Sequence, residues 1–189
     1  MDNTKNIRKS ILNKLTELED YQVEKHLVIS EEIIDIICEI TEKTGKEVAI
    51  YVDRRGSVIS TEIGDENTVS LKSVTKRRGE ESLSGIRCVH THPNGDGRLS
   101  DVDFSALKKL KFDMIGAIGV QDGEMKNCQL GFLCPTEEGD MGFAAAGPYT
   151  KEKLLKIDIL STIEEIEKNL TGARRASKET DDEVEKAIL

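Results

Sequence analysis

Two histidines, a serine and three aspartates lie close together in the stretch R-C-V-H-T-H-P-N-G-D-G-R-L-S-D-V-D, residues 87–103. Imidazole nitrogens and carboxylate oxygens are common protein ligands for zinc and other divalent cations. His90 lies on a predicted strand over residues 86–91, and His92 directly follows it. With extended backbone the two side chains project from one face, with Cα atoms roughly 6.6 Å apart. This spacing allows both imidazoles to bind one metal ion.

The third ligand is expected from the helix that follows the turn-forming loop at residues 94–97. Ser100 is predicted to be the N-cap and Asp103 the N3 residue, where the helix dipole favours an ionised carboxylate. With His90, His92 and Asp103 as ligands, a tetrahedral Zn²⁺ keeps its fourth position open to water, as catalytic sites do. The pKa of that water would fall to about 7. Zinc is preferred here over manganese or iron.

Other interpretations of the same residues remain open. Ser100 and Asp103 also have the spacing of an ordinary capping box, which would indicate only the start of a helix. Cys88 lies on the same predicted strand face as His90 and His92 and forms an alternative ligand set with them. We favour Asp103 as the third ligand, because free cysteine is more often a small buried apolar residue.

The pattern around this stretch predicts a mixed β-sheet flanked by helices, of the α/β (α+β) class. On the first strand, Val48, Ile50 and Val52 are expected on one face, and Glu47, Ala49, Tyr51 and Asp53 on the other. Residues 139–150 are glycine-rich, and we expect them to be irregular and to form part of a substrate groove. Helical periodicity is found over residues 5–22, 30–44, 100–111 and 150–170, and strand patterns over residues 47–53, 58–64, 86–91, 113–121 and 127–135.

Composition limits the functions that the chain can have. Its 189 residues are 37% hydrophobic, enough for the core of one medium domain. A net charge of −9 argues against a general nucleic-acid-binding surface. No apolar run approaches 18 residues and the first residues lack a signal-peptide pattern, so we expect a soluble cytoplasmic protein with no membrane partner. The four cysteines show no C-x-x-C pairing and are interpreted as free thiols.

A basic run surrounds Gly79, ahead of the predicted metal-binding stretch. We interpret it as a solvated loop at the edge of the site, and binding of an anionic partner is the alternative. His26 has no partner at ligand spacing and is expected to be an ordinary surface histidine. The basic residues of this run are Lys72, Lys76, Arg77, Arg78 and Arg87.

The metal-binding stretch resembles the signature of the JAMM (MPN-type) metalloproteases, and the matching positions are His90, Thr91, His92, Pro93, Ser100 and Asp103. The resemblance implies a fold related to that of cytidine deaminases. It also implies that the motif serine, Ser100, helps to stabilise the tetrahedral intermediate, and that an upstream glutamate acts as general acid and base. Glu47, at the start of a strand 43 positions before His90, resembles that glutamate in placement. Glu62 and Glu66 are alternatives.

A second resemblance covers most of the chain. The segments I-R-K-S-I-L-N-K-L, V-D-R-R-G-S-V, A-I-G-V and E-K-A-I-L, together with the metal-binding stretch, look like the N-terminal region of HflX GTPases from clostridial-type bacteria. Those proteins associate with the ribosome, so the resemblance implies a ribosome partner through a full-length protein. No G-x-x-x-x-G-K-[ST] loop is present, and GTP is not expected to bind this chain.

These resemblances divide the chain into four expected parts. They are an N-terminal amphipathic helix and connector (1–29), a JAMM-like core (30–149), a C-terminal helix (150–172), and a charged linker towards a GTPase unit that is absent from the chain (173–189). Two functions follow: a zinc-dependent hydrolase of peptide or isopeptide bonds, or an inactive accessory module of an HflX-type GTPase. A DNA-linked role, as in the RadC proteins with their JAMM-like site, fits the acidic charge less well. The sequence indicates neither the substrate nor the oligomeric state.

Overall fold

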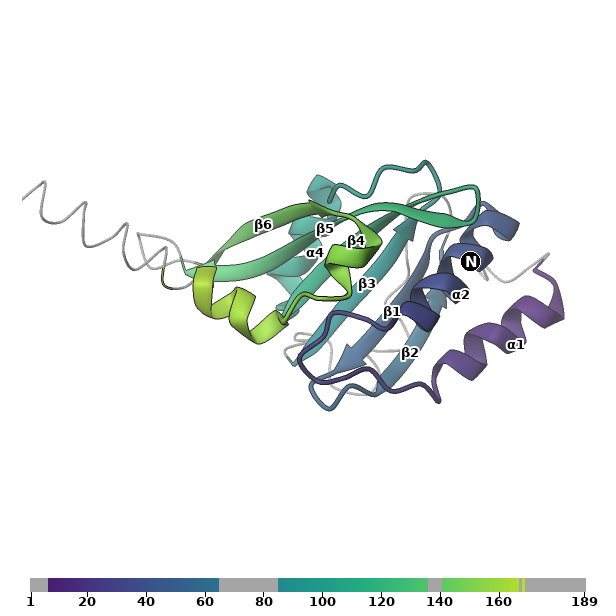
Figure 1. Ribbon diagram of the computed structural model, residues 1–189, viewed down its shortest axis with the longest axis horizontal. Helices are drawn as coiled ribbons and strands as arrows, with labels where there is room; N and C mark the ends of the chain where they lie inside the picture. Colours follow the sequence, from purple (N-terminus) through teal and green to yellow (C-terminus); the bar gives the residue numbers. More distant parts are fainter. Residues whose placement is uncertain (1–6, 65–84, 136–140, 167, 169–189) are drawn as a thin grey trace, which may run out of the picture.

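The computed structural model describes residues 7–64, 85–135, 141–166 and 168 of the chain. Within these residues the strands form one six-stranded sheet in the order β2-β1-β3-β4-β5-β6. The pair β3 and β4 is parallel and every other neighbouring pair is antiparallel, which confirms the predicted mixed sheet (Figure 1). The strands are β1 (Val48–Asp53), β2 (Val58–Ile63), β3 (Ile86–His92), β4 (Met114–Gln121), β5 (Glu124–Pro135) and β6 (Met141–Tyr149).

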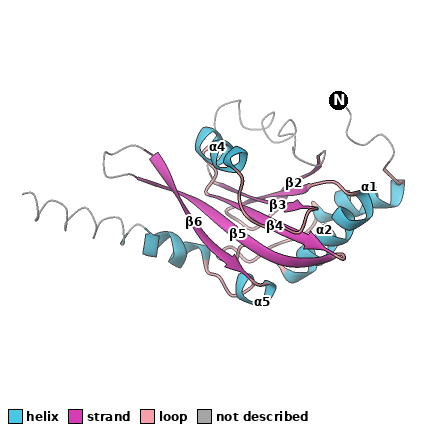
Figure 2. Ribbon diagram, turned by 90° about the horizontal axis from the view of Figure 1, so that it is seen from above, coloured by secondary structure: helices cyan, strands magenta, loops and turns pink. Residues whose placement is uncertain are grey.

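Helices cover both faces of this sheet (Figure 2). On one face lie α1 (Lys9–Leu18), α2 (Glu31–Thr44) and α5 (Lys151–Leu154), and on the other lies α4 (Asp101–Leu110). Two separate apolar clusters form as a result, a larger one under α1 and α2 and a smaller one under α4. None of the helices in the described part of the chain has the length and apolar content needed to cross a membrane.

Strand β1 lies between β2 and β3, and both of its faces are buried because an apolar cluster packs on each. Val48, Ile50 and Val52 pack in the larger cluster, whereas Ala49 and Tyr51 pack in the smaller one under α4. The alternation predicted from the sequence is confirmed. It also fixes which face of the neighbouring strand β3 each residue occupies, because Ala49 pairs with His90.

The turn between α2 and β1 determines where Glu47 lies. Helix α2 ends at Thr44, and Gly45 takes the left-handed conformation with φ 63°, which glycine adopts without steric cost. The Gly45 N–H donates to the Thr41 carbonyl at 2.8 Å. The chain therefore turns sharply. Glu47 immediately precedes β1 and lies near the C-terminal end of the neighbouring strand β3.

The prediction that residues 139–150 are irregular was wrong. Residues 141–149 form β6, which pairs with β5 and is an edge strand of the sheet formed by the described residues. Cross-strand pairing and packing outweigh the weak strand propensity of its glycines and alanines. Pro148 is compatible with an edge position, where a strand can lack one ladder hydrogen bond. Phe143 stacks on Phe104 of α4 with ring centroids 4.0 Å apart, and the cleft described below is lined by residues outside β6.

The single helix expected over residues 150–170 is interrupted. Helix α5 ends at Leu154, and a second helical segment covers residues 159–166. Asp158 begins this segment, because its Oδ1 accepts hydrogen bonds from the N–H groups of Leu160 at 2.9 Å and Ser161 at 3.1 Å. A capping aspartate competes with a continuous helix, and the apolar periodicity did not reveal it. The expected linker at 173–189 lies outside the described residues.

Arg87 is not part of a solvated basic loop, contrary to the prediction. It lies in β3 with 6% of its surface exposed, and its guanidinium donates to the carbonyl oxygens of Val28, Lys25 and Glu24 at 3.1, 3.2 and 3.4 Å. Arg87 thus joins the connector between α1 and α2 to the central sheet. The other residues of the basic run, Lys72, Lys76, Arg77 and Arg78, lie outside the described residues.

Candidate metal centre

His90 and His92 project from β3 on the face that carries α4, and their Nε2 atoms are 2.9 Å apart. Thr91 between them points to the opposite face. There its hydroxyl lies 2.6 Å from the hydroxyl of Thr41 and accepts a hydrogen bond from the Val48 N–H at 2.9 Å. The period of the strand therefore separates two histidines that face the cleft from a threonine that anchors β3 to α2 and β1.

Asp103 reaches the two histidines from the first turn of α4. Its Oδ1 lies 3.1 Å from His90 Nε2, and its Oδ2 lies 3.9 Å from His92 Nε2. The same Oδ2 accepts hydrogen bonds from the Ser100 N–H and the Ser100 hydroxyl, both at 2.7 Å, while the Ser100 Oγ accepts from the Asp103 N–H at 3.2 Å. The capping box is therefore present, and it leaves Oδ1 directed at His90.

The three side chains form a group that could hold a metal ion. One ligand atom from each of His90, His92 and Asp103 lies within 4.8 Å of the others. Tetrahedral ligands at the usual zinc bond lengths are about 3.3 Å apart. His90 Nε2 lies close to that distance from both partners, at 2.9 Å from His92 Nε2 and 3.1 Å from Asp103 Oδ1. Donor types and spacing both fit a divalent cation.

A backbone carbonyl fixes the tautomer of His92. Its Nδ1 lies 2.7 Å from the carbonyl oxygen of Asp96, which can only accept a hydrogen bond. Nδ1 must therefore carry the proton, and Nε2 of the neutral ring keeps its lone pair. That lone pair faces His90 and Asp103, as a metal ligand requires.

The charges of the group are strongly coupled. Burial by itself would lower the pKa of His90, but hydrogen bonds to Asp103 and Cys88 raise it to about 10. Burial would raise the pKa of Asp103, but His90 and Ser100 hold it well below its usual range. Burial and the nearby charge of His90 lower the pKa of His92. Without a metal, His90 and Asp103 form an ion pair, and a cation would replace the proton of His90.

Glu47 lies beside the three ligands. Its Oε1 is 4.0 Å from His92 Nε2, and 8% of the residue is exposed. Burial raises the pKa of Glu47 to about 7, with Asp103 acting in the same direction and His90 opposing it. Of the alternatives, Glu62 lies on β2 and is not among the residues that line the cleft, and Glu66 is outside the described residues. The structure therefore brings Glu47 to the site.

Cys88 is adjacent to the site but is not one of the three grouped ligands. It is buried and makes a hydrogen bond to His90, and burial raises the pKa of its thiol. Since the thiolate is the form that binds metals, these properties favour a packing role. All four cysteines are free thiols, as predicted, and all four are buried.

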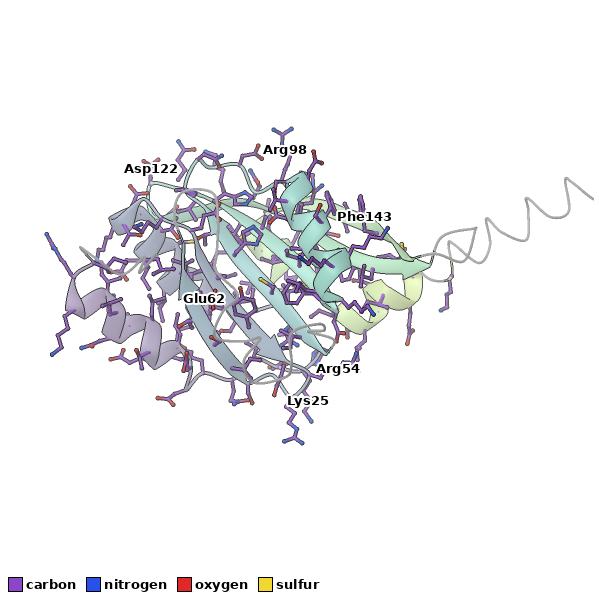
Figure 3. All side chains as sticks on the ribbon, turned by 180° about the vertical axis from the view of Figure 1, so that it is seen from behind. Lys25, Arg54, Glu62, Arg98, Asp122 and Phe143 are labelled. Atoms are coloured by element: carbon purple, nitrogen blue, oxygen red, sulfur yellow. The ribbon has the colours of Figure 1, made fainter. Side chains whose placement is uncertain are left out.

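A cleft of about 890 Å³ opens on the face of the sheet that carries α4. Figure 3 views the molecule from this side, with α4 in front of the sheet. Polar side chains that line it include the group of His90, His92 and Asp103, together with Glu47 and Ser100. Apolar residues from β1, β3 and β4 and the segment before β4 form its floor. These apolar residues are Ala49, Tyr51, Cys88, Phe112 and Ile115.

Sequence reasoning missed the role of the loop at residues 94–97. A backbone carbonyl such as that of Asp96 has no signature in side-chain types, although the flanking Gly95 and Gly97 do indicate a tight loop. Asn127 and Gln129, which contact this loop, belong to a strand with no distinctive sequence pattern.

No family model matches this chain, and neither the curated proteins nor the solved structures include a match to it.

Proposed function

We propose that this chain is a metal-dependent hydrolase of the JAMM type that cleaves peptide or isopeptide bonds. The observation that carries the proposal is the convergence of His90, His92 and Asp103 within 4.8 Å, beside a buried glutamate and inside a cleft. The signature resemblance and a fold of mixed sheet with α4 over the site support it. Zn²⁺ is the proposed metal, since two imidazoles and one carboxylate form a common catalytic zinc site.

The metal-binding residues are held in place by hydrogen bonds. His92 is oriented by the Asp96 carbonyl, and Asp103 is oriented by the N–H and hydroxyl of Ser100. A divalent cation bound there supplies Lewis acidity, which polarises a carbonyl group and acidifies water. The role of His90, His92 and Asp103 is to hold that cation in the cleft.

Glu47 is the proposed general base and acid. It would accept a proton from the attacking water and later donate that proton to the leaving nitrogen. A pKa of about 7 in the metal-free protein suits both transfers near neutral pH, although a bound cation would lower it. The apolar floor of the cleft would accommodate an apolar substrate side chain next to the bond that is cleaved.

Ser100 is proposed to support the oxyanion of the tetrahedral intermediate. Its hydroxyl donates to Asp103 Oδ2, but that oxygen also receives the Ser100 N–H at 2.7 Å. The hydroxyl can therefore turn towards a developing oxyanion while Oδ2 keeps one hydrogen-bond donor. Ser100 lies at the wall of the cleft, where such a movement would reach substrate.

The second candidate function is an inactive accessory module of an HflX-type, ribosome-associated GTPase in the cytoplasm. Segments that resemble those proteins support it. One structural observation also favours it: His90, Asp103 and Ser100 satisfy one another's hydrogen bonds, so the group is stable without a metal. The two functions differ in whether a metal is retained and whether bonds are cleaved.

The metal content of protein purified without a chelating tag tests the proposed site. We expect about one zinc per chain, and its loss in His90→Ala and Asp103→Asn. His26→Ala and Asp101→Asn are the matched controls, since His26 is exposed in the connector and Asp101 is an exposed acid in the same helical turn. Failure of the protein to bind added zinc, or retention of zinc by both site variants, would overturn the assignment.

The role of Glu47 is tested with mixtures of internally quenched peptides. Glu47→Gln should bind zinc as the unmodified chain does and lose hydrolysis, because the amide cannot accept the proton. Glu62→Gln should retain hydrolysis. Loss of hydrolysis in Glu62→Gln, with hydrolysis retained in Glu47→Gln, would assign the role to Glu62. Zinc binding without cleavage of any peptide would favour the accessory module.

A further inference from the structure

One row of residues crosses three strands beside the metal centre. His92 on β3 pairs with Gly119 on β4, and Gly119 pairs with Asn127 on β5. Gly119 leaves a gap in this row, and the loop at residues 94–97 occupies it. A Cβ atom at Gly119 would lie 2.3 Å from the Gly95 carbonyl oxygen and 2.5 Å from the Gly97 nitrogen. The loop backbone therefore packs directly on the sheet where a side chain would otherwise be.

Side chains of β5 hold the loop in this gap. Asn127 Oδ1 accepts a hydrogen bond from the Gly97 N–H at 2.7 Å, and its Nδ2 lies 3.5 Å from the Gly95 carbonyl oxygen. Gln129 Oε1 accepts from the Leu99 N–H at 2.9 Å, and the Gln129 N–H donates to the Gly97 carbonyl at 2.9 Å. Both the middle and the end of the loop are thus fixed to one strand.

Hydrogen bonds within the loop direct the carbonyl of Asp96 at His92. Asn94 Oδ1 accepts from the Asp96 N–H at 2.9 Å, and Asp96 Oδ1 accepts from the Arg98 N–H at 3.1 Å. The first bond fixes the peptide group before Asp96, and the second fixes the one between Gly97 and Arg98. The peptide group between them carries the Asp96 carbonyl, and Asn127 holds it through the Gly97 N–H. Its carbonyl oxygen then lies 2.7 Å from His92 Nδ1, on the side of the ring opposite Nε2.

We propose that Asn127 and Gln129 are positioning residues for the metal centre. They act through the loop and the Asp96 carbonyl to keep the proton of His92 on Nδ1, so that the Nε2 lone pair faces His90 and Asp103. Partners of this kind set ring orientation and ligand basicity in metal sites. The effect on metal affinity rests on the proposed function, whereas the effect on the His92 tautomer does not require a metal.

The tautomer is measured in metal-free protein by ¹⁵N NMR of the imidazole rings. The chain has three histidines, so His26→Ala and His90→Ala assign the His92 signals. We expect a protonated Nδ1 and an unprotonated Nε2 in His92. Asn127→Leu, similar in size but without the acceptor, should give a mixture of tautomers, and Asn127→Asp, which keeps an acceptor for Gly97, should restore the Nδ1–H form. An unchanged tautomer in Asn127→Leu would overturn the proposal.

Zinc affinity, measured by competition with a chromophoric chelator, gives the second readout. Asn127→Leu and Gly119→Ala should weaken binding by about 10- to 100-fold, the usual effect of losing such a partner. Gly116→Ala is the control, because it lies on the same strand but faces the Leu130 side chain in the other core. Equal zinc affinities in the parent chain and in the three variants would contradict the proposal. A parent chain that binds no zinc would instead refute the metal site, and the tautomer result would still decide the role of Asn127.

Discussion

Substitutions at Thr91 test how β1 and β3 are held together on the face of the sheet opposite the candidate metal centre. Its hydroxyl accepts from the Val48 N–H at 2.9 Å and lies 2.6 Å from the hydroxyl of Thr41, and both threonine side chains are fully buried. This pairing fixes the residue that follows Glu47. Replacing Thr91 with valine keeps the shape of the side chain and removes only the hydroxyl, so no cavity forms.

The expected cost of Thr91→Val follows from the groups that lose a partner. A buried N–H without an acceptor costs about 1–3 kcal/mol, and loss of the hydroxyl pair adds about 1 kcal/mol. Together they should lower the free energy of unfolding by about 2–4 kcal/mol. For a chain of this size, that corresponds to a fall in melting temperature of roughly 4 to 16 °C. Thr91→Ser keeps the hydroxyl and removes one methyl group, at a cost of about 1 kcal/mol. Serine should therefore be better tolerated than valine.

Urea unfolding followed by circular dichroism measures both variants, with Thr41→Val completing a double-mutant cycle. The double variant should be more stable than the sum of the single effects predicts by about 1 kcal/mol, since the hydroxyl pair is lost only once. A Thr91→Val protein at least as stable as Thr91→Ser would refute the reasoning, because it would mean that apolar burial outweighs the hydrogen bonds to Val48 and Thr41.

Two further predictions concern the charges around β3. Because the pKa of His90 is about 10 in the metal-free chain, a cation must displace a proton, so zinc affinity should rise about tenfold per pH unit between pH 6 and 8. Competition titrations at several pH values check this, and an affinity independent of pH would contradict it. Arg87→Met keeps an apolar stem but removes the donor of the Val28 and Lys25 carbonyls, so it should lower the free energy of unfolding by about 2–4 kcal/mol. The Glu24 carbonyl still accepts from the Leu27 N–H at 3.0 Å. Urea unfolding measures this loss, and a change below about 0.5 kcal/mol, as for an ordinary surface site, would show that the arginine is dispensable.

Much of the fold could be predicted because it follows from local patterns. The alternation of Val48, Ala49 and Ile50, the Ser30 and Gly45 ends of α2, and the hairpin at Asp122 all have a clear sequence signal. The errors have non-local causes. Residues 141–149 form a strand because β5 is next to them, and the helix expected over 150–170 is interrupted where Asp158 caps a new segment and Ile159 donates to the His26 carbonyl at 2.7 Å.

The group of residues that could hold a metal ion could also be predicted, whereas the groups that orient these residues could not. The spacing of His90 and His92 on a strand and the position of Asp103 in a first helical turn are local properties. The hydrogen bond from His92 to a backbone carbonyl depends on a loop that packs against β4 and β5, about 30 residues further along the chain. No pattern of residue types around His92 reveals such a contact.

Asp103 shows why capping and metal binding are compatible interpretations of one S-x-x-D pattern. The capping box uses Oδ2, and the Ser100 N–H and hydroxyl hold that oxygen at 2.7 Å. This leaves Oδ1, rigidly oriented, 3.1 Å from His90. A carboxylate at a helix N-terminus is also kept ionised by the helix dipole, which a metal ligand requires. The cap therefore supplies both the orientation and the charge state of the proposed third ligand, and a helix start at this position is a requirement of the site.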